Sequence, residues 1–360
     1  MFQKKTIGFF NTNLAWGGGE KWHLETAKLM RDQGYNVVIF AHPNSDLLQK
    51  ATELNIKTEA QRITNLSFIN LFTLINLSRK FRKYKIDTII TNLSSDMKAG
   101  SIAAAWAKVP NIIYRRGNAR IIKNSWINRY IFQDILTSLI VNSEDLKEKI
   151  LFYNGRIVKA NKIHVVQNYI PSSKDESNLP LTKPENKKLI LSNAGRLVEQ
   201  KGQKYLLQLA QRLKEQSYPF EIHIAGKGPL ESELKSLASK AKVDDVIVWH
   251  GFVENMRSFI EKTDVFLFPS VHEGMSNVIL EVMNIGRPIV AFNVSSMSEI
   301  INHESTGYLV PFDDLEAFAQ CTIKLMESSQ LREKMALKAK QRIAEAFSEK
   351  TFLERFLSLI

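Results

Sequence analysis

Short apolar runs alternate with amphipathic stretches along most of the chain. Residues 6–10 have the composition of a buried strand, a helical pattern follows the glycines at 17–19, and residues 37–40 form the next strand-like run. Repeated strand–helix units of this kind predict a parallel sheet with helices on both faces. The further elements predicted in this half are helices at 71–84 and 99–107 and strands at 86–90, 112–114, 139–142 and 163–166.

A second alternating block begins at residue 189, after a stretch of different character. Residues 169–188 contain three prolines, many charges and almost no periodicity, which is typical of an interdomain linker. We therefore expect two similar α/β domains, residues 1–168 and 189–345. The strand-like runs of the second block lie at 189–192, 221–225, 246–249, 265–268, 289–292 and 307–310.

The composition agrees with two globular domains. A chain of 360 residues can bury two cores, and its 44% hydrophobic and 24% charged residues are ordinary proportions. The single cysteine, Cys321, excludes a disulfide framework and fits a reducing compartment. The apolar run near the N-terminus is too short for a signal peptide, and no stretch reaches the roughly 18 apolar residues of a membrane span. We expect a cytoplasmic protein.

The net charge of +12 is concentrated in the N-terminal half. Residues 1–168 contain 25 Lys and Arg against 12 Asp and Glu, a balance of +13, whereas the remainder has 24 against 25, a balance of −1. Such an excess favours a polyanionic partner, either an anionic membrane at the inner face of the plasma membrane or an anionic acceptor. A solvated basic face is the alternative. No nucleic-acid module accompanies the charge, which argues against nucleic acid.

The most informative stretch is residues 270–288, SVHEGMSNVILEVMNIGRP. It follows a strand-like run and consists of a small-residue loop that leads into a helical pattern. Such a unit directs the N–H groups and the positive dipole of a helix start into one pocket, where phosphate is the usual ligand. Glu273 in the loop and Glu281 in the helix could each accept hydroxyl groups of a sugar or a ribose. The alternative makes them a loop residue and a solvated helix position.

This stretch resembles the donor-site signature of glycosyltransferase family 4, E-G-x-x-N-x-x-x-E-x-M-x-x-G-x-P. The resemblance implies an α/β GT-B architecture, two Rossmann-like doubly wound domains that face each other across a cleft. It also implies retaining sugar transfer from a nucleotide-sugar, and a final helix, residues 346–360, that crosses back onto the N-terminal domain. The matching positions are Glu273, Gly274, Asn277, Glu281, Met283, Gly286 and Pro288.

Arg196 and Lys201 flank a strand-to-helix turn and match the family's pattern G-R-x-x-x-x-K-G at residues 195–202. Fixed cations at such a turn can neutralise a diphosphate and stabilise the charge that builds on its β-phosphate as the glycosidic bond breaks. Surface charge at a helix start is the alternative. The sequence contains no Asp-x-Asp triplet and no H-x-H or HExxH spacing, so neither a metal nor another cofactor is expected.

The resemblance also implies roles for other residues of the second domain. Arg196, Lys201 and Glu273 would carry the catalysis, and Glu281 would hold the ribose. The further donor-binding residues would be Gly251, Phe252 and Val253 for the nucleobase, and Gly274, Met275, Ser276 and Asn277 for the sugar and phosphate.

Two features of the N-terminal half bear on the same site. The glycine loop at 17–19 permits a phosphate or sugar to approach the backbone closely, with Gly18 as the candidate contact. It is not the dinucleotide fingerprint, because Trp22 stands at the third glycine position. Many family members carry a histidine after an N-domain strand, where this chain has Arg116. Arg116 takes over the donor contact, binds an anionic group or has a structural role only.

These observations predict a glycosyltransferase that moves a sugar from a nucleotide-sugar, in our prediction a UDP-sugar, to a glycan or lipid-linked acceptor of envelope polysaccharide or lipopolysaccharide. Two alternatives stay open. One is a nucleotide-sugar epimerase of the same fold, and the other is a non-catalytic nucleotide-sugar-binding scaffold, which the missing histidine favours. A nicotinamide oxidoreductase is disfavoured because no strand leads into a complete G-x-G-x-x-G.

Overall fold

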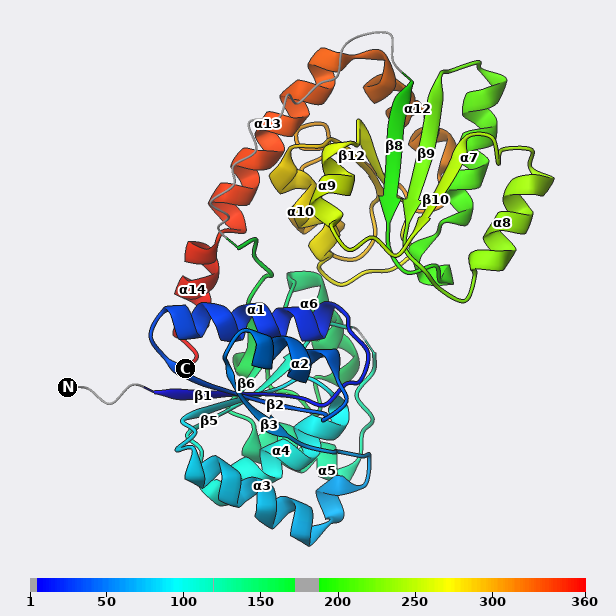
Figure 1. The fold of residues 1–360 in the computed structure, drawn as a ribbon. Helices are drawn as coiled ribbons and strands as arrows, with labels where there is room; N and C mark the ends of the chain where they lie inside the picture. The colour runs from blue at the N-terminus through cyan, green and yellow to red at the C-terminus, as the bar shows by residue number, and fades with distance from the viewer. Residues whose placement is uncertain (1–4, 119, 172–187) are drawn as a thin grey trace. The chain divides into compact units, whose positions relative to one another are not determined.

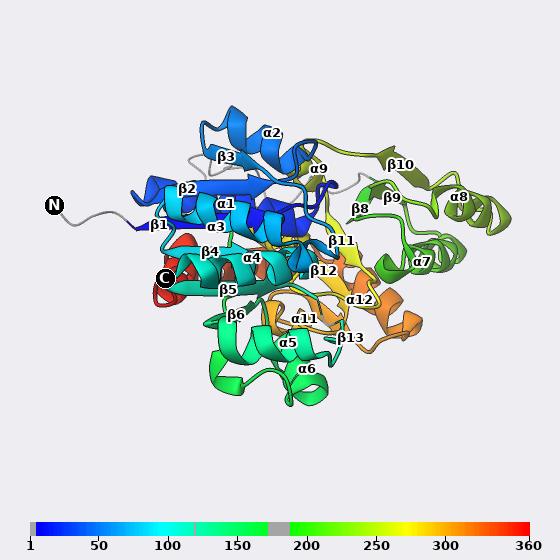
Figure 2. The ribbon, with the colours of Figure 1, turned by 90° about the horizontal axis from the view of Figure 1, so that it is seen from below.

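The computed structural model describes residues 5–118, 120–171 and 188–360, which divide into two compact units (Figures 1 and 2). Unit 1 consists of Met1–Asn168 with Phe352–Ile360, and unit 2 consists of Tyr169–Thr351. Each unit has its own parallel sheet and its own hydrophobic core. Most of the predicted linker falls on residues 172–187, which lie outside the described part of the chain.

The described residues of unit 1 form a seven-stranded parallel sheet in the order β3-β2-β1-β4-β5-β6-β7. The chain moves outward from β1 to β3 and then returns to β4, so the strand order reverses between β1 and β4. In Figure 1, α1 and α2 lie on one side of this sheet and α3, α4 and α5 on the other. The strands are β1 (Thr6–Asn11), β2 (Asn36–Ala41), β3 (Lys57–Ala60), β4 (Thr88–Thr91), β5 (Asn111–Arg116), β6 (Ser138–Val141) and β7 (Ile163–Val165).

Parallel strands need crossover connections, and helices provide most of them in this sheet. Polar N-cap side chains begin several of them: Ser45, Asn70 and Ser143 accept from backbone N–H groups of the first turn. The helices are α1 (Gly18–Asp32), α2 (Asp46–Glu53), α3 (Leu71–Lys83), α4 (Ser94–Ala107), α5 (Trp126–Tyr130) and α6 (Glu144–Asn154), with short turns η1 (Ser67–Ile69), η2 (Ile131–Ile135) and η3 (Ala160–Lys162).

The described residues of unit 2 repeat the architecture with six strands in the order β10-β9-β8-β11-β12-β13, and the order reverses between β8 and β11. The strands are β8 (Leu189–Ala194), β9 (Phe220–Ala225), β10 (Ile247–Gly251), β11 (Val265–Phe268), β12 (Ile289–Phe292) and β13 (Tyr308–Val310). The helices are η4 (Glu199–Lys201), α7 (Lys204–Glu215), α8 (Glu231–Lys240), α9 (Met256–Glu261), α10 (Asn277–Ile285), α11 (Met297–Ile300), α12 (Leu315–Glu327) and α13 (Ser329–Ala346).

The central strands are mostly apolar because helices cover both faces of each sheet. All six residues of β1 are buried, as are all four of β12. In β12, Val290 and Phe292 pack into the core beneath α7 and α12, whereas Ile289 and Ala291 pack into the core beneath α10. This alternation is the two-residue period of a strand, expressed on two buried faces.

The C-terminal helix α14 (Glu349–Leu357) is divided between the two units, which differs from our expectation. We expected residues 346–360 to belong to the N-terminal domain, but only Phe352–Ile360 do so. Phe347 is 2% exposed in the core of unit 2, and Ser348 bridges to Ile170, which holds this segment with unit 2. Phe352 and Phe356 pack edge-on against Trp22 of α1, with ring centroids 6.2 and 6.1 Å away.

Within the described residues of unit 1, the helices α2, α5 and α6 and the strand β3 were not predicted from the sequence. The edge strand β3 has the sequence KTEA and is largely exposed, so it lacks the apolar run by which the other strands were predicted. Within the described residues, every helix is too short or too polar to cross a membrane.

Candidate active site

The centre of unit 2 is an ion pair between two loops that meet where the strand order reverses. Lys201 follows β8 and Glu273 follows β11, and these strands are neighbours in the sheet. The Lys201 Nζ lies 2.5 Å from the Glu273 Oε1 and 5.4 Å from the centroid of the Phe268 ring. The Glu273 side chain is 8% exposed and that of Lys201 is 21% exposed. Ligands of open parallel sheets bind at this reversal, beyond the carboxyl ends of the strands.

Backbone contacts at two glycines hold these loops together. Gly202 has φ +64°, and a Cβ there would lie 2.0 Å from the carbonyl oxygen of Pro269. Gly226 has φ +138°, and a Cβ there would lie 1.9 Å from the carbonyl oxygen of Gly195. Both positions therefore require glycine for their conformation and for their space. The loops after β8, β9 and β11 are packed backbone to backbone.

Helix α10 begins at this same edge of the sheet. Ser276 is its N-cap residue, and no side-chain hydrogen bond caps the helix there. Two contacts fix the loop before it: the Ser296 hydroxyl donates to the carbonyl oxygen of Gly274, and Met275 is buried in the core. Asn277 opens the helix, and Glu281 lies one turn further, partly exposed. This arrangement directs a helix N-terminus toward the ion pair's loop, which is suited to a phosphate.

The end of β10 lies beside the loop of β9. Its last residue, Gly251, accepts a hydrogen bond from the Gly226 N–H at 2.6 Å through its carbonyl oxygen. The Phe252 side chain is 72% exposed, whereas Val253 packs against the core beneath α10. An exposed aromatic ring at a strand end can provide a flat apolar surface for a planar ligand.

Several polar groups at this edge have no hydrogen-bond partner within the described residues. Three such oxygens are buried: Asn193 Oδ1 at the end of β8, Gln203 Oε1 before α7, and Ser270 Oγ after β11. Buried polar atoms are nearly always hydrogen-bonded in folded proteins, so these three oxygens are candidates for contacts with water or a ligand. The Arg196 side chain is exposed at the same turn, while its carbonyl oxygen accepts from Gln203 Nε2.

Unit 1 places a second polar cluster at its own strand-order reversal. The Glu20 Oε1 accepts from Asn11 Nδ2 at 3.0 Å and from Asn13 Nδ2 at 3.1 Å, although Glu20 is only 4% exposed. Asp96, at the start of α4, is fully buried and accepts from both the N–H and the hydroxyl of Thr12. Burial raises the pKa of Asp96 to about 7; hydrogen bonds from Thr12 oppose this rise, and the charge of Glu20 adds to it.

Two arginines at the end of β5 border this cluster. The Arg115 guanidinium is buried over the Trp22 ring, 4.7 Å from its centroid, and burial lowers the pKa of Arg115 to about 10. Burial and the charge of Arg115 lower the pKa of His23 to about 3, so this histidine is neutral. Arg116 is 8% exposed, and its Nε donates to the carbonyl oxygen of Asn118. Gly18 is exposed in the first turn of α1.

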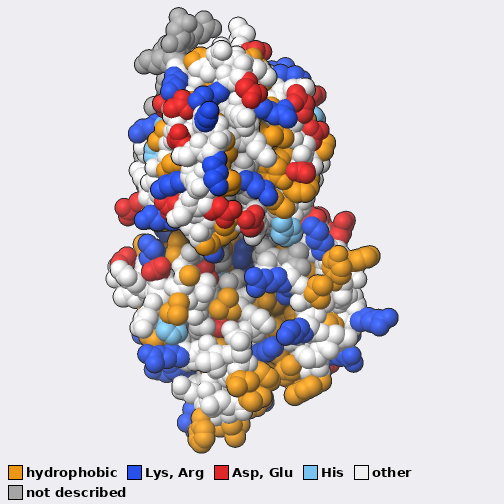
Figure 3. Space-filling model, turned by 90° about the vertical axis from the view of Figure 1, so that its right-hand side faces the viewer, with side chains coloured by type: hydrophobic (Ala, Val, Ile, Leu, Met, Phe, Trp, Pro, Cys, Tyr) orange, Lys and Arg blue, Asp and Glu red, His pale blue; other side chains and the backbone are white. Residues whose placement is uncertain are grey.

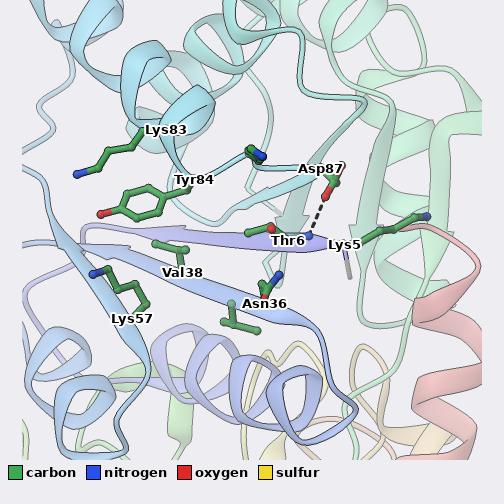
Figure 4. A pocket seen from close by; sticks show the side chains of 10 residues that line it. Lys5, Thr6, Asn36, Val38, Lys57, Lys83, Tyr84 and Asp87 are labelled. Atoms are coloured by element: carbon green, nitrogen blue, oxygen red, sulfur yellow. Dashed lines mark hydrogen bonds between the residues drawn. The ribbon is translucent and has the colours of Figure 1, made fainter. Parts of the chain in front are cut away.

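Unit 1 also has a cavity of about 700 Å³ at the opposite edge of its sheet (Figure 4). It is lined at the amino ends of the strands, where Asp87 accepts from the Thr6 N–H, and its lining includes Lys5, Lys57, Lys83 and Lys85. Because ligands of such sheets bind at the carboxyl ends, we do not place the active site there. Across residues 5–118, 120–171 and 188–360, no three His, Cys, Asp or Glu side chains gather as metal ligands.

Comparison with known families decides the class of the protein. The profile described as "Glycosyltransferase Family 4" matches residues 16–174, and that described as "Glycosyl transferases group 1" matches residues 173–342. The chain belongs to glycosyltransferase family 4. It is therefore a glycosyltransferase, as the signature at residues 270–288 predicted.

Relatives agree with this assignment, and solved glycosyltransferase structures share the fold. An uncharacterized glycosyltransferase of Haemophilus influenzae is 25% identical over 93% of this chain and 94% of its own. The capsular polysaccharide biosynthesis glycosyltransferase CapM of Staphylococcus aureus is 26% identical over 92% and 91%. A glycosyltransferase structure from Rickettsia africae has a TM-score of 0.86 at 20% identity, covering 99% and 98%. Anabaena HepE, solved with UDP, has a TM-score of 0.82 at 17% identity, covering 98% of each chain.

The structure brings some predicted site residues of this glycosyltransferase together directly. Lys201 and Glu273 form the ion pair, and the loop before α10 carries Gly274 to Asn277 at the same edge of unit 2. It also shows residues that we had not selected: Glu20, Asp96 and Arg115 of unit 1. Their signal was present in the sequence, because each is a charged residue that closely follows or ends a strand of the parallel sheet.

Replacing Lys201 by methionine should destabilise the enzyme, because Glu273 would keep its charge in a buried position without its partner. We expect a loss of about 2 kcal/mol in the free energy of unfolding. Chemical denaturation measures it, and the double variant Lys201→Met/Glu273→Gln should recover part of the loss. As a control, Lys235→Met removes an exposed pair with Glu231 and should change stability little. Equal losses at the two lysines would contradict this account.

The buried carboxyl of Asp96 should make stability depend on pH. Its pKa of about 7 lies above the ordinary value of 3.8, so between these values the unfolded chain has released a proton that the folded chain keeps. Stability from this group is thus present at low pH and is lost as the pH rises from about 4 to 7, at roughly 1 kcal/mol per pH unit. Denaturant unfolding at several pH values should show wild type losing stability relative to Asp96→Asn across this range. Parallel profiles would refute the assignment, and exposed Asp46→Asn is the control.

Proposed function

We propose that the enzyme transfers a sugar from a UDP-sugar, with retention of configuration and without a metal ion, to a glycan or lipid-linked acceptor of cell-envelope polysaccharide or lipopolysaccharide. Two kinds of comparison support the substrates. The relatives include the lipopolysaccharide core biosynthesis glycosyltransferase LpsE of Rhizobium meliloti and the UDP-Gal:alpha-D-GlcNAc-diphosphoundecaprenol alpha-1,3-galactosyltransferase of Escherichia coli. HepE has been solved with UDP and with UDP-glucose.

The observation that carries the proposal is the set of charges at the strand-order reversal of unit 2. The bond that breaks joins the anomeric carbon to an oxygen of the β-phosphate, so negative charge grows on the departing diphosphate. Arg196 and Lys201 follow β8, and the N-terminus of α10 follows the neighbouring strand β11. These fixed positive groups stabilise the transition state more than the bound donor, because the charge they face develops during the reaction.

Lys201 needs a stable position to do this. Its ion pair with Glu273 holds the ammonium in place, while Glu273 has further acceptor capacity for sugar hydroxyl groups. The amides of Gly274, Met275, Ser276 and Asn277 would bind the sugar and the phosphate as the helix begins. Catalysis in this proposal rests on Arg196, Lys201 and Glu273.

The nucleoside would occupy the neighbouring part of the same edge. Backbone groups of Gly251, Phe252 and Val253 would meet the base, with the exposed Phe252 ring beside it. Glu281 would accept from two adjacent ribose hydroxyl groups, since one carboxylate can accept both.

Unit 1 also contains candidate substrate-binding residues. Gly18 at the start of α1 and Arg116 at the end of β5 lie at the carboxyl edge of its sheet, where substrates bind. The excess of Lys and Arg over Asp and Glu in residues 1–168 suits an anionic acceptor, and contact with an anionic membrane at the inner face of the plasma membrane.

Donor binding can be tested by thermal shift with UDP-, GDP- and ADP-glucose. We expect the UDP-sugar to raise the melting temperature of wild type by several degrees, through preferential binding to the folded state. Glu281→Ala should lose most of this shift, because the ribose loses its acceptor. Glu333→Ala, an exposed position on α13, is the control and should keep the shift. Stabilisation by GDP- or ADP-glucose instead would refute the choice of base.

Turnover tests the role of the cations. Arg196→Ala should lower kcat for donor cleavage by about 10² to 10³ while leaving the melting temperature unchanged, because this side chain is exposed and stabilises only the developing charge. Arg212→Ala, which removes an exposed ion pair with Glu316, is the matched control. EDTA should not change the rate, and NMR of the product should show the anomeric configuration of the donor. A normal rate in Arg196→Ala would count against the proposal.

A further inference from the structure

Unit 1 carries an apolar cavity of about 290 Å³ that opens on its surface, away from the polar cluster described above. Five elements, η1, α3, α4, α5 and η2, contribute to it, and its lining contains no charged side chain. Four aromatic rings belong to the lining. The residues are Phe68, Ile69, Leu74, Ile102, Ala105, Trp106, Trp126, Ile127, Tyr130 and Ile135.

Large apolar side chains stand exposed around this cavity. Phe72, in the first turn of α3, is 87% exposed, Trp126 is 74% exposed and Ile69 is 65% exposed. Figure 3 shows hydrophobic side chains gathered with Lys and Arg over the lower end of unit 1, where Figure 1 places α3 and α5. Single exposed apolar residues are ordinary, but a contiguous group of this size marks a surface that another body covers.

Most of the charges carried by the elements around the surface are positive. Residues 60–86 and 97–133, which include η1, α3, α5 and most of α4, contain six and seven Lys and Arg and no Asp or Glu. Arg115 and Arg116 of the second stretch are buried. The carboxylates of the remaining parts are Asp96, which is buried at the start of α4, and Asp134, which is exposed in η2.

The cations lie close to the aromatic rings: the Lys98 Nζ is 5.3 Å from the Phe68 centroid, and Arg82 donates to the carbonyl oxygen of Trp106. On α5, Arg129 lies between Trp126 and Tyr130 in sequence.

We propose that this surface, defined by Ile69, Phe72, Trp106, Trp126 and Tyr130 with its surrounding cations, docks the enzyme on a bilayer that contains anionic lipid. The identification rests on the proposed function, which places a lipid-linked acceptor among the substrates. Aromatic rings with a polar edge favour the boundary between headgroups and acyl chains, and Lys and Arg favour anionic headgroups. The absence of carboxylates in both stretches matches a surface of uniform negative charge.

The position of the surface in the fold fits this role. The chain that leaves Arg116 at the carboxyl end of β5 leads directly into α5, whose first residue is Trp126. One connection of unit 1 therefore joins the membrane surface to the edge where we place the substrates.

Vesicle flotation tests the proposal with the full chain. We expect wild type to float with vesicles of equal parts phosphatidylglycerol and phosphatidylcholine, and not with phosphatidylcholine alone. Phe72→Ser/Trp126→Ser should weaken binding at least about tenfold, because two exposed rings no longer enter the bilayer. Lys98→Gln/Arg129→Gln should weaken it severalfold, and added salt should weaken it further. Leu337→Ser, 55% exposed on α13 of unit 2, is the matched control and should bind as wild type does.

Thermal shift with UDP-glucose on the same samples separates this proposal from the proposed function. A serine variant that keeps the donor shift and loses the vesicles supports the docking surface. A wild type that binds donor but no anionic vesicle overturns the docking surface and leaves the proposed function standing. Undiminished flotation of both double variants also overturns it. A concentration-dependent dimer that only the serine variant abolishes, with no flotation of wild type, would assign the surface to a second copy of the chain instead.

Discussion

The ion pair between Lys201 and Glu273 is the contact around which the candidate active site of this family 4 glycosyltransferase is built. It joins the loop after β8 to the loop after β11, at 2.5 Å, with the carboxylate almost wholly buried. Two opposite charges in such a site stabilise each other only when both are present. The pair therefore fixes an ammonium group at the edge of the sheet where we propose that the donor diphosphate binds.

The pair depends on the topology of the sheet. Some seventy residues separate its members, and they meet because the strand order reverses between β8 and β11. Gly202 and Gly226 allow the backbones of the adjoining loops to touch. Any side chain at these two positions would push the loops apart. Rigid loops hold catalytic groups in a defined geometry before substrate arrives.

Unit 1 uses the corresponding place differently. Its reversal between β1 and β4 holds two buried carboxyl groups, Glu20 and Asp96, beside the buried cation of Arg115. Burial disfavours each charged form, so it raises the pKa of Asp96 and lowers those of Arg115 and His23. Burying these groups costs free energy, which the packing of the surrounding core must offset. In the same unit, aromatic and basic side chains of α3 and α5 are exposed, in contrast to the aromatic rings that are buried in its core.

The sequence by itself determined the family, through the motif at residues 270–288. It also determined the α/β class and most of the strands, because a strand that is buried on two faces is visible as a short hydrophobic run. It could not show the polar edge strand β3, which has no apolar run, or the point at residue 351 where α14 passes from one unit to the other. Glu273 and Lys201 were identifiable as residues of a resembling motif, but their contact was not, since it depends on which strands become neighbours. Only the tertiary structure decided which charges are buried and paired, because burial and pairing arise from distant segments that the chain order does not place side by side.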